Sequence, residues 1–284
     1  MKRVYGVIGY PISHSLSPII HNIGFKYHNI NAVYGIFETP PEKLEEAIKG
    51  IKALGILGVN ITIPHKINVI KYLDVLSEEI SIFNSVNTIK NDNSKLIGYS
   101  TDYYGFIKAL TIKNINYKEF SILIIGTGGA AKAIVNGLIG IDKHPKVAIA
   151  GRNKEKLLNL KNEIKNKFNY SIEIIDLNSK EFKAKIKENE FNILVNATSV
   201  GMGNQKDMSI INKELINSSH IVYDIVYSPL NTLLIKYAKE KNATFIYGID
   251  MLIYQAEKAF NIWTGKELPI DEVKKELEKY LDKE

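Results

Sequence analysis

Residues 120–125 form an apolar run that leads directly into the glycine-rich sequence GTGGAA (126–131), and helix-forming residues follow to about residue 140. Such a run is typical of a strand buried on both faces of a parallel sheet. A glycine-rich turn between this strand and a helix lets phosphate groups approach the backbone at the helix N-terminus. The pattern predicts a Rossmann-type dinucleotide site, although a strand–helix turn without a ligand would look similar. The residues expected at the pyrophosphate are Gly126, Gly128, Gly129, Ala130 and Ala131.

The rest of the chain alternates strand-like and helix-like segments, which predicts an α/β fold built from parallel strand–helix units. In the first part, strands are expected at 4–8, 33–37, 58–63 and 85–89, and helices at 18–28, 42–53 and 102–110. In the second part, strands are expected at 120–125, 146–150, 172–175, 191–196, 221–224 and 244–247. The later helices are expected at 154–167, 180–187, 230–241, 250–263 and 271–283.

The strand–helix pattern restarts near residue 103, which predicts two domains. Residues 103–248 would form the doubly wound, parallel-sheet domain that binds the dinucleotide. Residues 1–102, together with about 249–284, would form a discontinuous α/β domain that binds the substrate.

The composition excludes several classes of protein. The 284 residues include no cysteine, which excludes disulfides, thiolate catalysis and cysteine-based metal sites. No apolar run approaches the roughly 18 to 20 residues that a membrane helix needs, and the N-terminus does not resemble a signal peptide. We therefore expect a cytoplasmic protein with no membrane partner. The net charge of +6 is spread along the chain, which argues against nucleic-acid binding, and the dispersed histidines predict no metal site.

The end of the expected strand 146–150 indicates which dinucleotide binds. An NAD site usually places Asp or Glu there, whereas this chain has the sequence GRNKEK with no acid before Glu155. Arg152 is one of only two arginines among 37 basic residues, and a guanidinium can bind a 2′-phosphate with two parallel hydrogen bonds. A solvated arginine in a turn is the alternative. NADP is the predicted cofactor, held at this turn by Gly151, Arg152, Asn153 and Lys156.

Polar motifs in the first hundred residues predict a site for a hydroxylated carboxylate. In GYPISHSLSP, Ser15 and Ser17 precede a helix start that favours an anion, and an extended backbone would place both hydroxyls on one side. The alternative is that Ser17 only caps the helix. Lys66 lies just past the expected strand 58–63, where α/β proteins collect functional groups, and Asp102 opens the next helix. Such a pair suits the oxygen of a reacting carbinol.

Taken together, the motifs GYPISHSLSP, GVNITIPHK, NSVNTI, STDYYG, GTGGAAKA, NATSVGM, YDIVYSP and GIDMLIYQAEKAF closely resemble those of the shikimate dehydrogenases, in order and spacing, over nearly the whole chain. The resemblance implies the reversible, NADPH-dependent reduction of 3-dehydroshikimate to shikimate in aromatic amino-acid biosynthesis. It also implies that Lys66 and Asp102 are the catalytic pair. The residues that would bind shikimate are Ser15, Ser17, Thr62, Asn87, Tyr227 and Gln255. The cofactor residues would also include Thr198, Ile225 and Gly248.

Some alternatives stay open at this point. One is a quinate/shikimate dehydrogenase of broader specificity, and another is a catalytically silent, NADP-binding regulator on the same fold. The intact Lys66 and Asp102 argue against the regulator. The serine motif argues against the methylene-tetrahydrofolate dehydrogenases, which share the second-domain architecture. Gly151 stands where the family usually has Asn, which bears on cofactor preference. The oligomeric state, for which a homodimer is one option, does not follow from the sequence.

Overall fold

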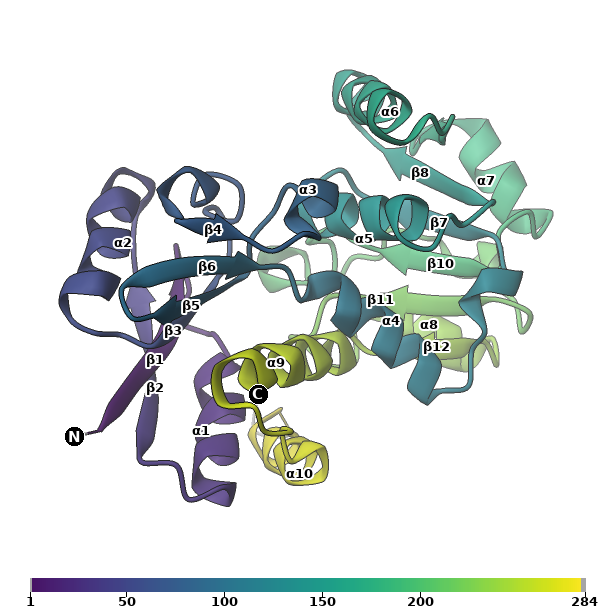
Figure 1. The fold of residues 1–284 in the computed structure, drawn as a ribbon. Helices are drawn as coiled ribbons and strands as arrows, with labels where there is room; N and C mark the ends of the chain where they lie inside the picture. Colours follow the sequence, from purple (N-terminus) through teal and green to yellow (C-terminus); the bar gives the residue numbers. More distant parts are fainter. Residues whose placement is uncertain (1, 282–284) are drawn as a thin grey trace. The chain divides into compact units, whose positions relative to one another are not determined.

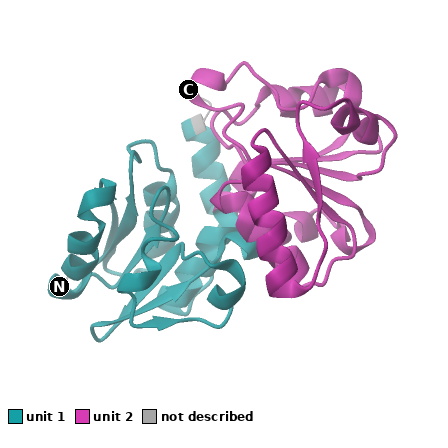
Figure 2. Ribbon diagram, turned by 90° about the horizontal axis from the view of Figure 1, so that it is seen from above, with its two compact units in different colours: residues 1–105, 253–284 teal, residues 106–252 magenta. Residues whose placement is uncertain are grey.

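The computed structural model describes residues 2–281, and its chain divides into two compact units (Figures 1 and 2). Unit 1 comprises Met1–Gly105 and Ile253–Glu284, and unit 2 comprises Phe106–Leu252. The sequence analysis placed the boundaries at 102/103 and 248/249, a few residues earlier. The last residues of the expected helix 271–283 and of the expected domain segment 249–284 lie outside the described residues.

Unit 1 contains one mixed sheet in the order β2-β1-β3-β5-β6-β4. Its strands are β1 (Arg3–Gly9), β2 (Ala32–Glu38), β3 (Gly58–Ile61), β4 (Val75–Leu76), β5 (Thr88–Asp92) and β6 (Lys95–Tyr99). Strand β1 is parallel to β2 and β3, whereas β5 is antiparallel to both β3 and β6. The expected parallel strand–helix units are present in β1, β2 and β3, but extending that expectation to the strand at 85–89 was an error, because both pairings of β5 are antiparallel.

The hairpin between β5 and β6 explains that error. Its two turn residues, Asn93 and Ser94, have φ values of 51° and 68°, the left-handed geometry that suits a two-residue turn between antiparallel strands. A parallel crossover needs a dozen or more residues, so this connection forces antiparallel pairing. A strand was expected at 85–89 with the helix at 102–110 as the next element, whereas β6, the short β4 and the short helix α3 (Ile80–Phe83) were not predicted.

The helices of unit 1 pack on the two faces of its sheet. Helix α2 (Leu44–Ala53) contributes Leu44, Ile48 and Ile51 to an aliphatic core with β3 and β5. Helix α1 (Ser17–Tyr27) belongs to an aromatic cluster that also includes residues of β1, β2 and α9 (Gly248–Thr264). Helix α10 (Ile270–Leu281) packs against α1. The members of the aromatic cluster are Tyr5, His21, Phe25, Tyr34, Phe260 and Trp263.

Unit 2 is a parallel sheet in the order β12-β11-β10-β7-β8-β9. Its strands are β7 (Ile122–Ile125), β8 (Val147–Gly151), β9 (Glu173–Asp176), β10 (Ile193–Asn196), β11 (Ile221–Asp224) and β12 (Thr244–Ile246). Its helices are α5 (Gly129–Gly140), α6 (Lys154–Phe168), α7 (Lys180–Lys187) and α8 (Leu233–Glu240), with α4 (Asp102–Ile112) crossing the boundary between units. This order confirms the predicted doubly wound architecture, in which the chain reverses direction between β7 and β10.

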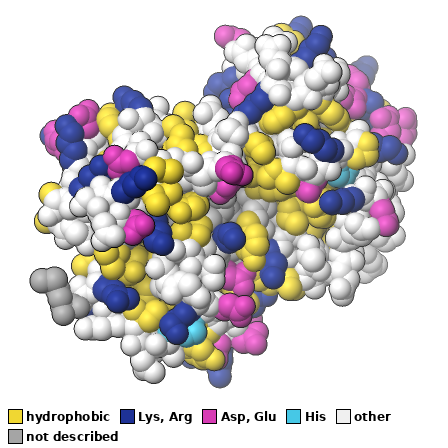
Figure 3. All heavy atoms as spheres, viewed as in Figure 1, with side chains coloured by type: hydrophobic (Ala, Val, Ile, Leu, Met, Phe, Trp, Pro, Cys, Tyr) yellow, Lys and Arg dark blue, Asp and Glu magenta, His cyan; other side chains and the backbone are white. Residues whose placement is uncertain are grey.

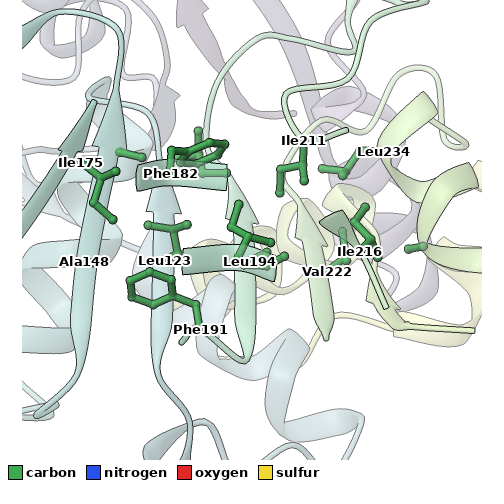
Figure 4. Packing of buried hydrophobic residues seen from close by; sticks show 14 of the residues in the cluster. Leu123, Ala148, Ile175, Phe182, Phe191, Leu194, Ile211, Ile216, Val222 and Leu234 are labelled. Atoms are coloured by element: carbon green, nitrogen blue, oxygen red, sulfur yellow. The ribbon is translucent and has the colours of Figure 1, made fainter. Parts of the chain in front are cut away.

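The core of unit 2 lies between its sheet and its helices. Leu123, Ala148, Leu194 and Val222 project from four neighbouring strands on the same face and meet apolar residues such as Phe182 from α7 (Figure 4). The buried strand β7 leads from this core directly into the glycine-rich turn. Among the described residues, no helix has the length and apolar character needed to cross a membrane. Figure 3 shows Lys and Arg side chains scattered over the visible face of each unit, with acidic side chains among them.

Candidate active site

Lys66 and Asp102 form an ion pair within unit 1, with Nζ of Lys66 2.5 Å from Oδ2 of Asp102. Lys66 follows the end of β3, and its backbone carbonyl accepts a hydrogen bond of 2.8 Å from Val86 N. Asp102 is the first residue of α4. The side chains are 19% and 8% exposed, so the pair is largely shielded while the lysine still reaches solvent. An ammonium group in this position can donate to a small molecule bound beside it.

Asn87 orients the carboxylate of Asp102 from the side opposite Lys66. Its Nδ2 donates to Oδ1 of Asp102 at 2.9 Å, and its Oδ1 accepts from the backbone N–H of Thr101 at 2.7 Å. Gln255, on α9, places Oε1 3.3 Å from both Asn87 Nδ2 and Thr101 Oγ1. Four separate segments of the sequence, carrying Lys66, Asn87, Thr101–Asp102 and Gln255, therefore contribute to one polar cluster around Asp102.

The segment that carries Ser15 and Ser17 is a turn. Ser15 N donates to the carbonyl of Ile12 at 3.0 Å, and Leu16 has helical backbone angles (φ −82°, ψ −9°). The expectation of an extended backbone here was wrong, because this turn leads directly into the first turn of α1. Leu16 is the N-cap residue of α1 and Ser17 is its first helical residue, so the alternative in which Ser17 caps the helix is also wrong. Ser15 Oγ accepts a hydrogen bond of 3.3 Å from Ser17 N, the backbone N–H of the first residue of α1.

The remaining predicted substrate residues fall on different elements. Thr62 is half-buried just past β3, and its N–H donates to the carbonyl of Ile8 at 2.9 Å. Gln255 belongs to the cluster around Asp102. Tyr227 lies in unit 2, just past the end of β11. Unit 1 by itself thus brings together Lys66, Asp102, Asn87 and Gln255, but not Tyr227.

The glycine-rich turn of unit 2 has the backbone geometry of an anion site. Gly126 has a φ of +127°, and a Cβ built on it would lie 2.6 Å from the carbonyl oxygen of Ala197, so only glycine fits. A Cβ on Gly128 or Gly129 would meet no atom within 4 Å, which leaves the start of α5 open. Within the part of the chain that the structure describes, no side chain caps α5. Its first N–H groups are therefore available to an anion.

The end of β8 presents basic side chains near the start of α6. Gly151 is buried, whereas Arg152 and Lys156 are exposed. Asn153 is the N-cap of α6, because its Oδ1 accepts from Lys156 N at 2.9 Å. The cap begins α6 directly after the strand, and Arg152, the residue before the cap, is exposed at this turn. This part of unit 2 is therefore electropositive and suits a phosphate.

A second polar cluster lies at the ends of β10 and β11. Asn196 Oδ1 accepts from the hydroxyl of Thr198 at 2.7 Å, and its Nδ2 donates to Asp224 at 2.9 Å. Asp224 is fully buried, and burial raises its pKa to about 6, although hydrogen bonds from Thr232, Val226 N and Asn196 oppose that shift. Next to this cluster, a Cβ on Gly248 would lie 2.4 Å from the carbonyl oxygen of Ile225. Three predicted cofactor residues thus lie near these strand ends. Thr198 and Ile225 follow the ends of β10 and β11, and Gly248 lies against Ile225.

The comparisons with known proteins decide the family. A curated shikimate dehydrogenase (NADP+) from Nitrosopumilus maritimus is 43% identical to this chain over 277 residues, which cover 98% of each protein. The chain belongs to the shikimate dehydrogenase family. The family's substrate-binding domain model matches residues 7–89, and its C-terminal domain model matches residues 248–278.

Solved structures of shikimate dehydrogenases have the same fold. One crystal structure of a shikimate dehydrogenase in complex with NADP+ is 39% identical, has a TM-score of 0.90, and aligns with 99% of this chain and 96% of its own. A shikimate 5-dehydrogenase from Thermus thermophilus, in complex with NADP(H) and shikimate, is 30% identical with a TM-score of 0.83, covering 96% and 97% of the two chains. The fold predicted from the shikimate dehydrogenase motifs is confirmed.

In each unit, some buried polar residues beside the predicted site residues were not singled out from the sequence. Asn196 and Asp224 each end a buried parallel strand, and that position, where α/β sites collect polar groups, would have been enough to find them. Tyr34 and Thr88 gave no such signal, since both are ordinary strand residues. Within the described residues, no group of three or more His, Asp or Glu side chains is arranged to hold a metal ion.

Proposed function

We propose that this chain catalyses the reversible, NADP-dependent reduction of 3-dehydroshikimate to shikimate. The observation that carries the proposal is the buried cluster in which Asn87 and Lys66 hold opposite oxygens of Asp102. The curated relatives that match nearly the whole chain are named shikimate dehydrogenase (NADP+). An intact acid–base pair in such a family favours an enzyme over a silent regulator.

The side chains of unit 2 fit NADP. The open start of α5 and the close backbone approach at Gly126 suit a pyrophosphate, and Arg152 with Lys156 suits the 2′-phosphate. When bound, NADPH supplies the hydride that reduces the ring ketone. The residues that would hold it are Gly126, Gly128, Gly129, Ala130, Ala131, Gly151, Arg152, Asn153, Lys156, Thr198, Ile225 and Gly248.

Lys66 provides the proton in this proposal. Its ammonium donates to the ketone oxygen as negative charge develops there, and in the reverse direction its neutral amine accepts the hydroxyl proton. Asp102 holds Nζ in place and balances its charge. A positioned general acid of this kind typically contributes about 100- to 10,000-fold to the rate.

Six residues bind the substrate in this proposal. Ser15 and Ser17 donate to the carboxylate, and Tyr227 lies near that group. Thr62, Asn87 and Gln255 hold the ring hydroxyls. The hydroxyls and amides in this set can both donate and accept, as a polyhydroxylated acid requires.

We also propose that the enzyme works in the cytoplasm with small molecules as partners, without nucleic acid or a membrane. The absence of cysteine fits a reducing compartment, and the scattered positive charge fits a small anionic substrate. A homodimer is one option for the oligomeric state, which light scattering on the purified protein would determine.

The proposal is tested by following NADPH formation with shikimate and quinate, each with NADP+ and NAD+. We expect turnover with shikimate and NADP+ to be fastest, and Lys66→Ala to lower kcat about 100-fold or more. Lys71→Ala, which removes an exposed lysine of the same segment, is the matched control and should leave kcat unchanged. Equal rates with shikimate and quinate would favour the broader-specificity alternative. A folded protein that binds NADP+ without turnover would favour the regulator.

A further inference from the structure

Three buried polar side chains connect the interior of unit 1 to the cluster around Asp102. Tyr34, Asn60 and Thr88 are 2%, 6% and 0% exposed, and we call them the positioning chain. Asn60 on β3 and Thr88 on β5 are direct partners in the antiparallel pairing of these strands. Tyr34 lies on β2 and reaches Asn60 from the edge of the sheet. Neither the catalytic pair nor the substrate residues of the proposed function include any of the three.

The orientation of the Asn60 amide follows from its neighbours. Asn60 Nδ2 lies 3.2 Å from the backbone carbonyl oxygen of Asn87, and a carbonyl can only accept a hydrogen bond. The amide nitrogen must therefore face Asn87, and Oδ1 must face the phenol of Tyr34, 2.7 Å away. Tyr34 consequently donates its single proton to Asn60.

The hydroxyl of Thr88 continues the chain in the same direction. It lies 3.1 Å from Asn60 Nδ2, which donates to it, and 3.2 Å from Oδ1 of Asn87. The oxygen of the Asn87 amide is identified by the Thr101 N–H, a pure donor 2.7 Å away. Thr88 therefore accepts from Asn60 and donates to Asn87, whose Nδ2 donates to Oδ1 of Asp102 at 2.9 Å.

We propose that Tyr34, Asn60 and Thr88 are positioning residues, whose hydrogen bonds all run toward Asp102 and hold its carboxylate in the orientation that receives Lys66. The inference rests on the proposed function, since it assigns these residues to the same reaction. Each donor polarises the next, and this strengthens the final bond to the carboxylate. The chain also stops the Asn87 amide from rotating, because rotation would turn its oxygen toward the carboxylate and break its bonds to Thr88 and Thr101.

Two substitutions of Thr88 separate this role from a purely structural one. Thr88→Val keeps the shape and volume of the side chain but removes the hydroxyl, whereas Thr88→Ser keeps the hydroxyl and removes a buried methyl group. We expect Thr88→Val to lower kcat for shikimate oxidation about tenfold, the size expected for one buried hydrogen bond, with the Kd for NADP+ unchanged. We expect Thr88→Ser to lower Tm through lost packing and to keep kcat within a factor of about two.

A second pair of variants tests the far end of the chain and does not depend on how Thr88→Val folds. Tyr34→Phe removes only the hydroxyl group, which donates to Asn60 and also interacts with the side chain of Ser17. Tyr5→Phe is the matched control, because Tyr5 pairs with Tyr34 in the β1–β2 register, is equally buried and packs on the same Trp263 ring. We expect Tyr34→Phe to lower kcat with the KM for shikimate unchanged, and Tyr5→Phe to leave both unchanged. A rise in KM with unchanged kcat would instead reflect the contact with Ser17 and would count against the positioning role.

The proposal is overturned if kcat follows Tm across the four variants, or if Thr88→Val and Tyr34→Phe both keep the kcat of the unaltered protein. Failure of the proposed function looks different, because the unaltered protein would then not oxidise shikimate at all. A fall in kcat confined to Thr88→Val and Tyr34→Phe supports the positioning chain.

Discussion

At the scale of single residues, two buried carboxylates have different surroundings. Asp102 faces the ammonium of Lys66, so it is held by an opposite charge. The recorded hydrogen bonds to Asp224 come from neutral groups: Thr232 Oγ1 at 2.6 Å, Asn196 Nδ2 at 2.9 Å and Val226 N at 3.1 Å. Burial outweighs these neutral donors and raises the pKa of Asp224 to about 6. A carboxyl of this kind makes stability depend on pH.

We predict that Asp224 lowers the stability of the native protein as pH rises through 6. Because its folded pKa lies above the unfolded value, its favourable contribution is complete below the unfolded pKa and is lost as the buried group ionises. Asp224→Asn is neutral throughout, so its unfolding free energy relative to the unaltered protein should rise by roughly 1 kcal/mol between pH 5 and pH 7.5. Urea unfolding of both proteins at the two pH values measures this. A difference that stays constant, or that shrinks, contradicts the prediction.

At the scale of elements, different residues of the turn from β8 to α6 cap the helix and remain available to a phosphate. Asn153 uses its side-chain oxygen to cap α6, so its amide helps to set the path of the backbone. Arg152 is exposed immediately before it and is not the cap. One residue of this turn therefore stabilises the helix, while its neighbour is available to a ligand.

We predict that Arg152→Ala raises KM for NADP+ much more than KM for NAD+. Loss of a hydrogen bond to a charged group should shrink the preference for NADP+ by about 1.5 to 3 kcal/mol. Steady-state kinetics with both cofactors provide the measurement. Arg3→Ala, which removes the other arginine from an exposed position on β1, is the control and should leave both KM values unchanged. Equal increases for the two cofactors would mean that Arg152 supports only the turn.

At the scale of the whole molecule, each unit has its own sheet and its own core. Unit 2 is one continuous segment, and its apolar cluster is drawn entirely from residues between Leu123 and Ala243. Unit 1 is discontinuous, because Phe260 and Trp263 near the end of the chain pack on Phe25 and Tyr5 near its start. The two units should therefore differ in their ability to fold as isolated segments.

We predict that residues 106–252 fold alone and bind NADP+, whereas residues 1–105 alone do not unfold cooperatively. Circular dichroism melting of the two fragments tests the difference. NADP+ at about 100 times its Kd should stabilise the 106–252 fragment by about 2.7 kcal/mol. A 106–252 fragment without a cooperative transition, or a stable 1–105 fragment, would contradict the independence of these cores.

Local patterns in the sequence were sufficient to predict much of this protein. The turn at 126–131, the absence of an acid after β8 and the motif around Lys66 depend on neighbours in the chain, because turns and strand ends follow from short-range geometry. The doubly wound sheet was predictable for the same reason, whereas the family followed from the resemblance of the motifs to those of the shikimate dehydrogenases. The same reasoning could have identified Asn196 and Asp224, the polar residues that end β10 and β11, but they were recognised only in the structure.

Only the tertiary structure determined which residues that are distant in the sequence contact one another around Asp102. The antiparallel pairing of β3 with β5 places Asn60 opposite Thr88, and the sequence analysis had expected parallel strands there. The bond from Tyr34 to Asn60 spans 26 residues, and the one from Asn87 to Gln255 spans 168. Strand register and the packing of α9 determine these contacts. Neither can be predicted from the residues that flank Asn60 or Thr88 in the sequence. The motifs that contain Lys66 and Asp102 were therefore recognisable in the sequence, whereas the hydrogen bonds that orient this ion pair depend on the folded sheet.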